Sequence, residues 1–383
     1  MDLIESPDDA GFRRQARAWL EENVPKRPLP SGDTRQGFVA HIEWERTMYD
    51  AGWAVVSWPP EFGGRGATTS RWLIFEEEYY RVGGPQRVTQ NGIFLLAPTL
   101  FEFGTAEQQQ RFLPPMGRGD ETWCQGWSEP NAGSDLAAIA TTAVADQDRG
   151  GWVVNGQKTW TTRGAFCDWM FALVRTDTTV DRPHQGMTYL LIPLTSDGVT
   201  VRGFERLDGD EGFAEVFLED VFVPDDQVLG EVNRGWYVAM ATTTSERGLT
   251  LRSPGRFSAS ARDLVVLCRE RLAEGRATDQ DRDAVIRAWM DAEAYRLYVQ
   301  QTATKMADGG DIGAESSLNK IWWSEMDVRL HRAALDLLGP EAEADVDRWM
   351  KGYQFALAGP IYAGTNEIQR NVVAERVLGL PRR

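Results

Sequence analysis

The spacing of apolar residues changes twice along this chain of 383 residues. In the first 120 residues apolar side chains recur at helical spacing, so that Phe12, Ala16 and Leu20 fall on one helix face. From residue 121 to 232, short β-rich runs such as 187–192 are separated by turn residues. Beyond that the helical spacing returns. The sequence therefore predicts an α+β fold with a helical domain (1–120), a middle β domain (121–232) and a second helical domain (233–383).

Charge and cysteine content disfavour several classes of protein. The formal net charge of -16 argues against nucleic acid, and a polyanionic ligand such as a coenzyme A ester would need local basic residues or helix N-termini. No apolar run approaches the roughly 18 residues that span a bilayer. Residues 1–9 are acidic and lack the apolar run of a signal peptide. Cys124, Cys167 and Cys268 show no metal-ligand spacing, so we expect a cytoplasmic protein with no metal site and no membrane segment.

Three polar segments carry a more specific signal. They are 123–135 (WCQGWSEPNAGSD), 155–162 (NGQKTWTT) and 361–370 (IYAGTNEIQR). Together, and in this order, they resemble the motifs of the acyl-CoA dehydrogenases, a family of flavoenzymes. The resemblance covers nearly the whole chain. It implies an acyl-CoA dehydrogenase-like fold whose C-terminal domain is a four-helix bundle, FAD as the cofactor, and an electron-transfer flavoprotein as the electron acceptor.

The resemblance also assigns residues to the flavin and the thioester. Ser128 would place its hydroxyl near the reactive nitrogen of the isoalloxazine ring, and Trp160 would stack near that ring. Gly133 and Ser134 would approach the thioester. The cofactor-binding residues implied by the motifs are Gln125, Trp127, Ser128, Gly133, Ser134, Trp160, Thr162, Thr365 and Glu367. Taken alone, the first motif is also typical of a surface turn, and Trp160 of a core aromatic residue. Three motifs in register favour the flavin interpretation.

The catalytic base departs from the family's common pattern. Removal of the α-proton of an acyl thioester needs a carboxylate whose pKa is raised by desolvation, but Ala363 stands where many members carry that glutamate. A minority of the family places the base on the first long helix after the β domain, and Glu246 falls on that position. Arg247 resembles a companion anchor, so the expected substrate contacts are Ser134, Arg247 and the backbone N–H of Ala363. The alternative for Glu246 is a solvent-facing Glu–Arg pair.

Two elements that bind the neighbouring subunit's FAD in homotetrameric members are altered here. Where the family has Arg-x-x-Phe-Gly, this chain has 271–275 with Glu274 in place of phenylalanine. Where the family has Gln-x-x-Gly-Gly, it has 336–340, with Asp336 and Pro340 at the first and last positions. Carboxylates repel a diphosphate, and proline lacks a donor N–H. Misalignment by a residue or two is the alternative interpretation.

These losses predict a heterotetramer (α2β2) in which a homologous partner subunit completes the FAD site. Such a division resembles the bacterial enzymes that desaturate bulky sterol side-chain CoA esters. We therefore expect FAD-dependent α,β-desaturation of an acyl-CoA thioester, with Glu246 as the base. Two alternatives stay open: a non-catalytic subunit of a heteromeric dehydrogenase, and a flavin oxidase or monooxygenase of the same fold.

Overall fold

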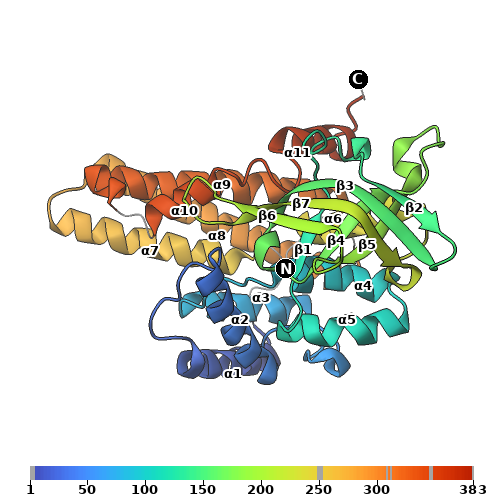
Figure 1. Cartoon of the computed structure of the whole chain (residues 1–383). Coiled ribbons are helices and arrows are strands. Elements are labelled where there is room, and N and C mark those ends of the chain that lie inside the picture. The colour runs from blue at the N-terminus through green and yellow to red at the C-terminus, as the bar shows by residue number, and fades with distance from the viewer. Residues whose placement is uncertain (1–4, 248–252, 308, 311–312, 345–347, 382–383) are drawn as a thin grey trace. The chain divides into compact units, whose positions relative to one another are not determined.

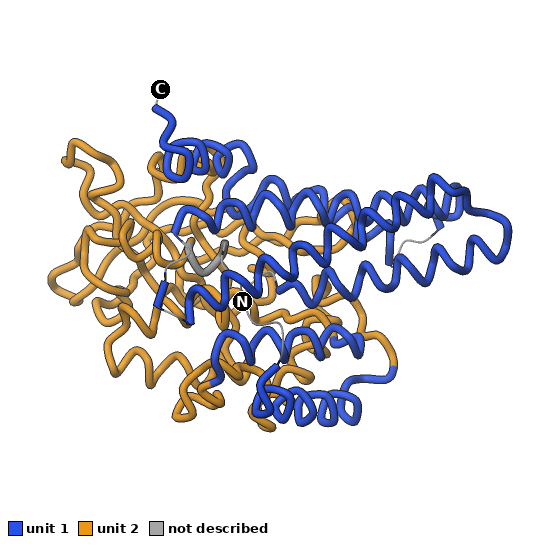
Figure 2. Tube along the Cα trace, turned by 180° about the vertical axis from the view of Figure 1, so that it is seen from behind, with its two compact units in different colours: residues 1–26, 67–84, 247–383 blue, residues 27–66, 85–246 orange. Residues whose placement is uncertain are grey.

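The computed structural model describes residues 5–247, 253–307, 309–310, 313–344 and 348–381, although the side chains of 244–247 lie outside that description (Figure 1). The chain forms two compact units, coloured separately in Figure 2. Unit 1 comprises 1–26, 67–84 and 247–383, and unit 2 comprises 27–66 and 85–246. Helices of the first 120 residues are thus divided between the two units.

Unit 1 is helical. Its helices are α1 (Pro7–Asn23), α3 (Thr69–Arg81), α7 (Pro254–Ala273), α8 (Asp279–Ala307), α9 (Ser316–Leu338), α10 (Trp349–Ala356) and α11 (Asn366–Val372). The long helices α7, α8 and α9 pack on one another, and α3 packs on α7. Phe257 of α7 lies in their core, edge-on to Tyr295 and stacked on Trp323 with ring centroids 5.6 and 6.4 Å away. Aromatic packing across three helices therefore holds this unit together.

Unit 2 contains the β-sheet and the remaining helices. The helices are α2 (Arg35–Asp50), α4 (Ala97–Phe103), α5 (Ala106–Arg118) and α6 (Gly235–Arg247). The strands are β1 (Trp123–Gly126), β2 (Thr142–Asp146), β3 (Gly151–Thr162), β4 (Trp169–Arg175), β5 (Met187–Pro193), β6 (Val199–Phe204) and β7 (Phe213–Pro224). Among the described residues they form one sheet of order β1-β4-β2-β3-β7-β6, with β5 paired to β4.

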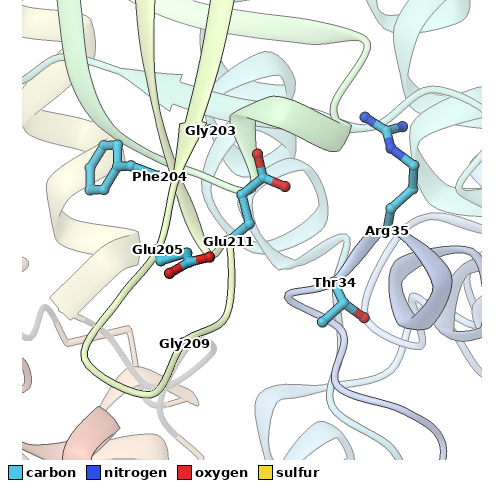
Figure 3. A pocket seen from close by; sticks show the side chains of 7 residues that line it. All are labelled: Thr34, Arg35, Gly203, Phe204, Glu205, Gly209 and Glu211. Carbon is cyan, nitrogen blue, oxygen red and sulfur yellow. The ribbon is translucent and has the colours of Figure 1, made fainter.

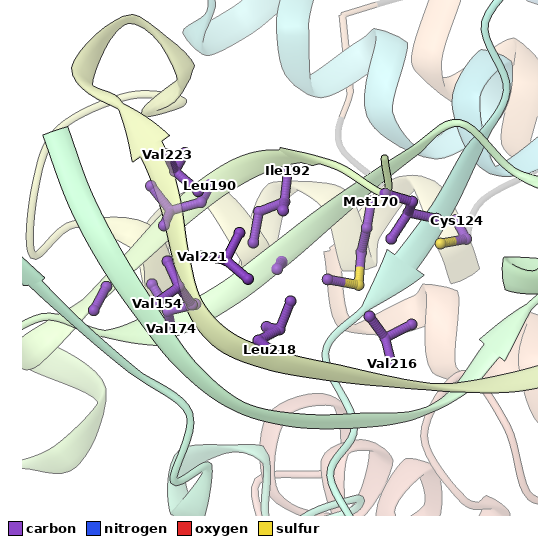
Figure 4. Packing of buried hydrophobic residues seen from close by; sticks show 13 residues of the cluster. Cys124, Val154, Met170, Val174, Leu190, Ile192, Val216, Leu218, Val221 and Val223 are labelled. Carbon is purple, nitrogen blue, oxygen red and sulfur yellow. The ribbon is translucent and has the colours of Figure 1, made fainter. Parts of the chain in front are cut away.

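The core of the sheet is a cluster of aliphatic and sulfur-containing side chains (Figure 4). Met170 of β4, Ile192 of β5 and Val216 of β7 are completely buried in it. Because β4 and β5 are buried on both faces, they are continuous apolar runs rather than alternating ones. Cys124 of β1 lies in the same cluster, which ties the first motif segment to the core.

The structure confirms the predicted order of helices, strands and helices. The β-rich run 187–192 identified in the sequence forms β5, and the other strands of the sheet also lie between residues 121 and 232. Ser6 caps α1 by accepting the N–H of Asp9 at 3.1 Å, with Pro7 in the first turn. None of the described helices is long and apolar enough to span a membrane.

Candidate flavin and substrate site

The end of β1 presents two polar side chains from the first motif. β1 pairs in parallel with β4, which fixes Gln125 opposite Phe171. Trp127 follows the strand and is 5% exposed, with its ring edge-on to Phe171 and Tyr189. Gln125 and Ser128 are half-buried, and their side chains form no hydrogen bond within the part of the chain that the structure describes. Trp127 is therefore buried against these two rings, and its indole N–H, like the polar groups of Gln125 and Ser128, has no hydrogen-bond partner among the described residues.

Strand β3 brings the second motif beside the first. The N–H of Thr159 donates to the carbonyl of Ser128 at 2.9 Å. A register shift between Lys158 and Thr161 in the β3–β7 pairing marks a bulge, and Trp160 lies in it with a φ of 58°. Its side chain is 59% exposed and contacts Phe204 and Phe213 edge-on. Trp160 is thus not a core residue, and its left-handed backbone is a strained conformation of the kind that concentrates at functional sites.

These residues fit a flavin ring. Thr162 is half-buried, and its hydroxyl has no hydrogen-bond partner among the described residues. The same holds for the Gln125 amide and the Ser128 hydroxyl. Unit 2 therefore offers an amide, two hydroxyls and an exposed indole from the end of β1 and from β3. That combination suits the polar edge and the flat face of an isoalloxazine. Gly133 and Ser134, predicted to approach the thioester, are exposed on the same loop, and a Cβ at Gly133 would meet nothing within 4 Å.

Helix α6 carries the predicted base. Glu246 and Arg247 lie in its last turn, although their side chains are outside the description, as is the whole of Gly248. One turn earlier, Thr242 is completely buried and its hydroxyl is 2.9 Å from that of Thr99 in α4. This hydrogen bond fixes the position of α6 within unit 2 up to the turn that holds Glu246.

The third motif forms a loop followed by α11 in unit 1. Ala363 has a φ of 56° and Gly364 one of 77°, so the backbone there is left-handed. The N–H of Ala363 has no acceptor among the described residues, as an oxyanion donor requires. Thr365 caps α11 by accepting the N–H of Ile368 at 3.3 Å, and Glu367 is exposed in the first turn. The pKa of Glu367 is lowered by its own backbone N–H and by the Thr365 hydroxyl.

Two buried lysines bind residues next to the first and third motif loops. Neither lysine was predicted to be a site residue from the sequence. Lys320 of α9 is completely buried and donates to the side-chain carbonyl of Asn366 at 2.7 Å, directly after the Ala363–Thr365 loop. Lys158 of β3 is completely buried and donates to Glu129 Oε1 at 2.8 Å. Lys158 was detectable as a charge inside a β-rich run and within the second motif. Lys320 lies in a helix with no comparable signal.

The segment 271–275, at the end of α7, forms ion pairs within unit 1. Arg271 bonds Glu274 at 3.2 Å and also bonds Glu341, which in turn bonds Arg276. The two arginines hold the pKa of Glu341 below its usual range. Asp336 is exposed near the end of α9 and Pro340 begins the next turn. Arg271 therefore has its charge matched by carboxylates of its own chain.

A cavity of about 410 Å³ opens in unit 2 near the start of α2 (Figure 3). It is lined by Thr34, Arg35, Gly203, Phe204, Glu205, Gly209 and Glu211. Arg35 donates to the carbonyl of Ala165 at 3.1 Å and lies over the Phe166 ring. Two carboxylates against one engaged arginine disfavour a phosphate ligand, so we assign no cofactor group to this cavity. In the described residues, no cluster of His, Cys, Asp or Glu is suited to a metal ion.

Comparison with known proteins identifies the family. Models of the acyl-CoA dehydrogenase N-terminal, middle and C-terminal domains match residues 6–120, 124–221 and 233–378. Acyl-CoA dehydrogenase IpdE1 of Mycobacterium tuberculosis is 40% identical over 382 residues, with 97% of each chain covered.

Two solved structures are similar over the full length of this chain and of their own. The Tcur3481-Tcur3483 steroid ACAD has a TM-score of 0.88 at 26% identity, with 100% of each chain covered. The ChsE4-ChsE5 complex from Mycobacterium tuberculosis has a TM-score of 0.84 at 28% identity, again with 100% of each chain covered. These matches confirm the predicted fold class and cofactor. The chain belongs to the acyl-CoA dehydrogenase family and is an FAD-dependent oxidoreductase.

Proposed function

We propose that this enzyme desaturates an acyl-CoA thioester between its α and β carbons, with Glu246 as the base. The observation that carries the proposal is a set of polar groups in unit 2 that have no hydrogen-bond partner among the described residues, together with the exposed ring of Trp160 on β3. Gln125, Ser128 and Thr162 supply those groups from the ends of two strands. When bound there, FAD supplies the acceptor for the β-hydride.

The chain's own residues have two further tasks. Glu246 takes the α-proton, which requires its carboxyl pKa to be raised by desolvation in the closed site. The N–H of Ala363, which has no acceptor among the described residues, donates to the thioester oxygen as negative charge develops on it. With alanine at 363, this loop supplies a hydrogen bond but no base, so the two tasks fall to different parts of the chain.

The proposed substrate is a bulky thioester, such as a sterol side-chain CoA ester. Support comes from the Tcur3481-Tcur3483 steroid ACAD, whose fold matches this chain from end to end. Alanine at 363 is compatible with a wide pocket because it removes a large side chain from the substrate side. Ser134 and Arg247 complete the proposed substrate contacts.

The proposed assembly is an α2β2 heterotetramer with a homologous partner subunit. The ion pairs around Arg271 support it, because they leave this chain without a free arginine at the element that binds a neighbouring FAD in homotetramers. Ile286, Trp289 and Met290 also support it. They lie on one face of α8, and each is between 45 and 58% exposed. ChsE4-ChsE5, a similar structure, is likewise a complex of two proteins. We propose an electron-transfer flavoprotein as the electron acceptor.

The test is a Glu246→Gln variant of the complex, assayed by anaerobic bleaching of the flavin on addition of an acyl-CoA. We expect the bleaching rate to fall about a thousandfold, the range of general-base catalysis, with the flavin spectrum unchanged. Glu231→Gln, an exposed glutamate just before α6, is the matched control and should react like the wild type.

Two outcomes would overturn the proposal. Unchanged bleaching in Glu246→Gln would show that the chain is a non-catalytic subunit or uses another base. Rapid reoxidation of the reduced flavin in air through a stable oxygen adduct would indicate an oxidase or monooxygenase.

A further inference from the structure

Lys158 is an ammonium group in the interior of a β-sheet. It lies in the middle of β3 and has no exposed surface. Its Nζ donates to Glu129 Oε1 at 2.8 Å and to the carbonyl of Leu173 in β4 at 2.7 Å. The carbonyl of Trp127 lies 3.4 Å away as a weaker acceptor. Three acceptors from two segments of the chain thus match the three donors of the ammonium group.

Glu129, the partner of Lys158, lies in the turn that follows the flavin-facing residue Ser128. It is 8% exposed and accepts the N–H of Ala140 at 2.6 Å and of Thr141 at 3.0 Å. Two backbone hydrogen bonds with Ala132 close the turn, at 2.9 and 3.0 Å. The carboxylate therefore ties both ends of the loop 129–141 to β3.

Stability alone does not account for this pair. A buried ion pair is often no more stabilising than well-packed apolar side chains of the same volume, because both charges must lose their water. Burial lowers the pKa of Lys158 to about 8 even with Glu129 beside it. What the pair supplies is a fixed distance between β3, β4 and the loop.

We propose that Lys158, through Glu129, is a positioning residue that sets the flavin-facing loop of this enzyme. The pair holds the Trp127–Ser128 backbone against β3, where Thr159 bonds the Ser128 carbonyl. Ser128 and Trp160 then keep the separation that the flavin ring requires. The inference rests on the proposed flavin role of these two residues.

The experiment compares Lys158→Met, Glu129→Gln and the double variant in the full chain, with any partner subunit that co-purifies. FAD affinity is measured by fluorescence titration, and the flavin absorption bands report the surroundings of the ring. We expect each single variant to bind FAD about tenfold or more weakly and to shift the flavin bands. The double variant, which leaves no unpaired buried charge, should recover thermal stability but neither FAD affinity nor the wild-type bands.

Arg87 and Glu45 provide a matched control in the same unit. They form an equally buried pair at 3.1 Å, with side chains 4% and 1% exposed, and neither belongs to a flavin motif. Glu45→Gln should lower stability while the flavin bands stay unchanged. If Lys158→Met and Glu129→Gln change FAD binding no more than Glu45→Gln does, or if the double variant restores wild-type binding, the pair has only a structural role.

Failure of this inference is distinguishable from failure of the proposed function. Glu246→Gln is judged on the rate at which an acyl-CoA bleaches the flavin, and we expect it to leave the spectrum of the oxidised flavin unchanged. The Lys158 and Glu129 variants are judged on the spectrum and on FAD affinity, without reference to turnover.

Discussion

Lys158 in unit 2 and Arg271 in unit 1 are both cations bound to glutamates, yet their surroundings differ. Lys158 and its partner Glu129 are buried, with side chains 0% and 7% exposed. Arg271 is mostly buried, but Glu274 and Glu341 are 51% and 49% exposed. In the interior a charge pair fixes the backbone around it, because breaking the pair leaves a buried charge without a partner. Near water an ion pair mainly cancels charge, and we propose that it leaves Arg271 with no net charge to offer a diphosphate.

The first prediction extends the comparison to the second buried lysine and has the largest expected effect. Asn366→Leu removes one acceptor of Lys320 Nζ and one of Ser324 Oγ, which lie 2.7 and 3.2 Å from Asn366 Oδ1. We expect a loss of about 2 to 3 kcal/mol in the free energy of unfolding, measured by urea denaturation. Glu367→Gln, the exposed neighbour, is the control and should unfold like the wild type. An equally small loss in Asn366→Leu would contradict a positioning role for this buried network.

The second prediction compares FAD affinity after removal of two exposed tryptophans, Trp160 in the proposed flavin site and Trp289 on α8. Trp160→Ala removes the stacking surface, so FAD should bind about 30-fold more weakly, or about 2 kcal/mol, by fluorescence titration. Stability should change little because the ring is 59% exposed. Trp289→Ala, at a position that is 45% exposed on α8, should leave FAD affinity of the isolated chain unchanged. Equal effects of the two substitutions would remove Trp160 from the site.

The third prediction uses pH to weaken only the buried pair. Burial lowers the pKa of Lys158 to about 8, so its charge is lost as the pH rises through 8. FAD should then dissociate faster, by about tenfold between pH 7 and 9, in stopped-flow release experiments. Lys158→Met should lack this pH dependence.

Rising pH should affect the free energy of unfolding in the opposite direction to FAD affinity. Between pH 8 and the ordinary lysine pKa of 10.5, the unfolded chain binds a proton that the folded chain has released. This group therefore makes the folded state relatively more stable as the pH rises through that window. FAD affinity and the contribution of Lys158 to stability should move in opposite directions. A parallel fall of both, absent from Lys158→Met, would contradict the assignment.

The smallest effect is expected at the exposed cluster. Glu341→Gln removes the carboxylate that Arg271 and Arg276 share. Because the pair is close to water, neither the melting temperature nor FAD binding by the isolated chain should change measurably. A clear gain in FAD binding would show that Arg271 was held back from a diphosphate only by Glu341, and that this end of α7 is a latent cofactor site.

Much of the fold follows from the sequence because its signals are local. Ser6 and Pro7 start α1, and β4 and β5 are short continuous apolar runs of the kind that is typical of buried strands. The division of the first 120 residues between two units has no such signal. α3 joins unit 1 by packing on α7, more than 170 residues later in the chain, and α1 joins it by packing on α3. Only tertiary contacts determine that.

The candidate site shows the same limit. The motifs and their order determine the family and the cofactor, and they predict the site residues, among them Glu246 as the base in a chain that has alanine at 363. The resemblance also predicts that Glu274 and Asp336 replace residues of the elements that bind a neighbouring subunit's FAD in homotetramers.

Only the tertiary structure decides which of these side chains are buried and which of their charges are paired. Trp127 is packed in the core whereas Trp160 is exposed on a bulge, although both are tryptophans of motif segments. Likewise, Arg271 is engaged by Glu341, a residue 70 positions away. Residue type and order are fixed by covalent connectivity, but burial and charge pairing depend on neighbours that the fold brings from distant parts of the chain.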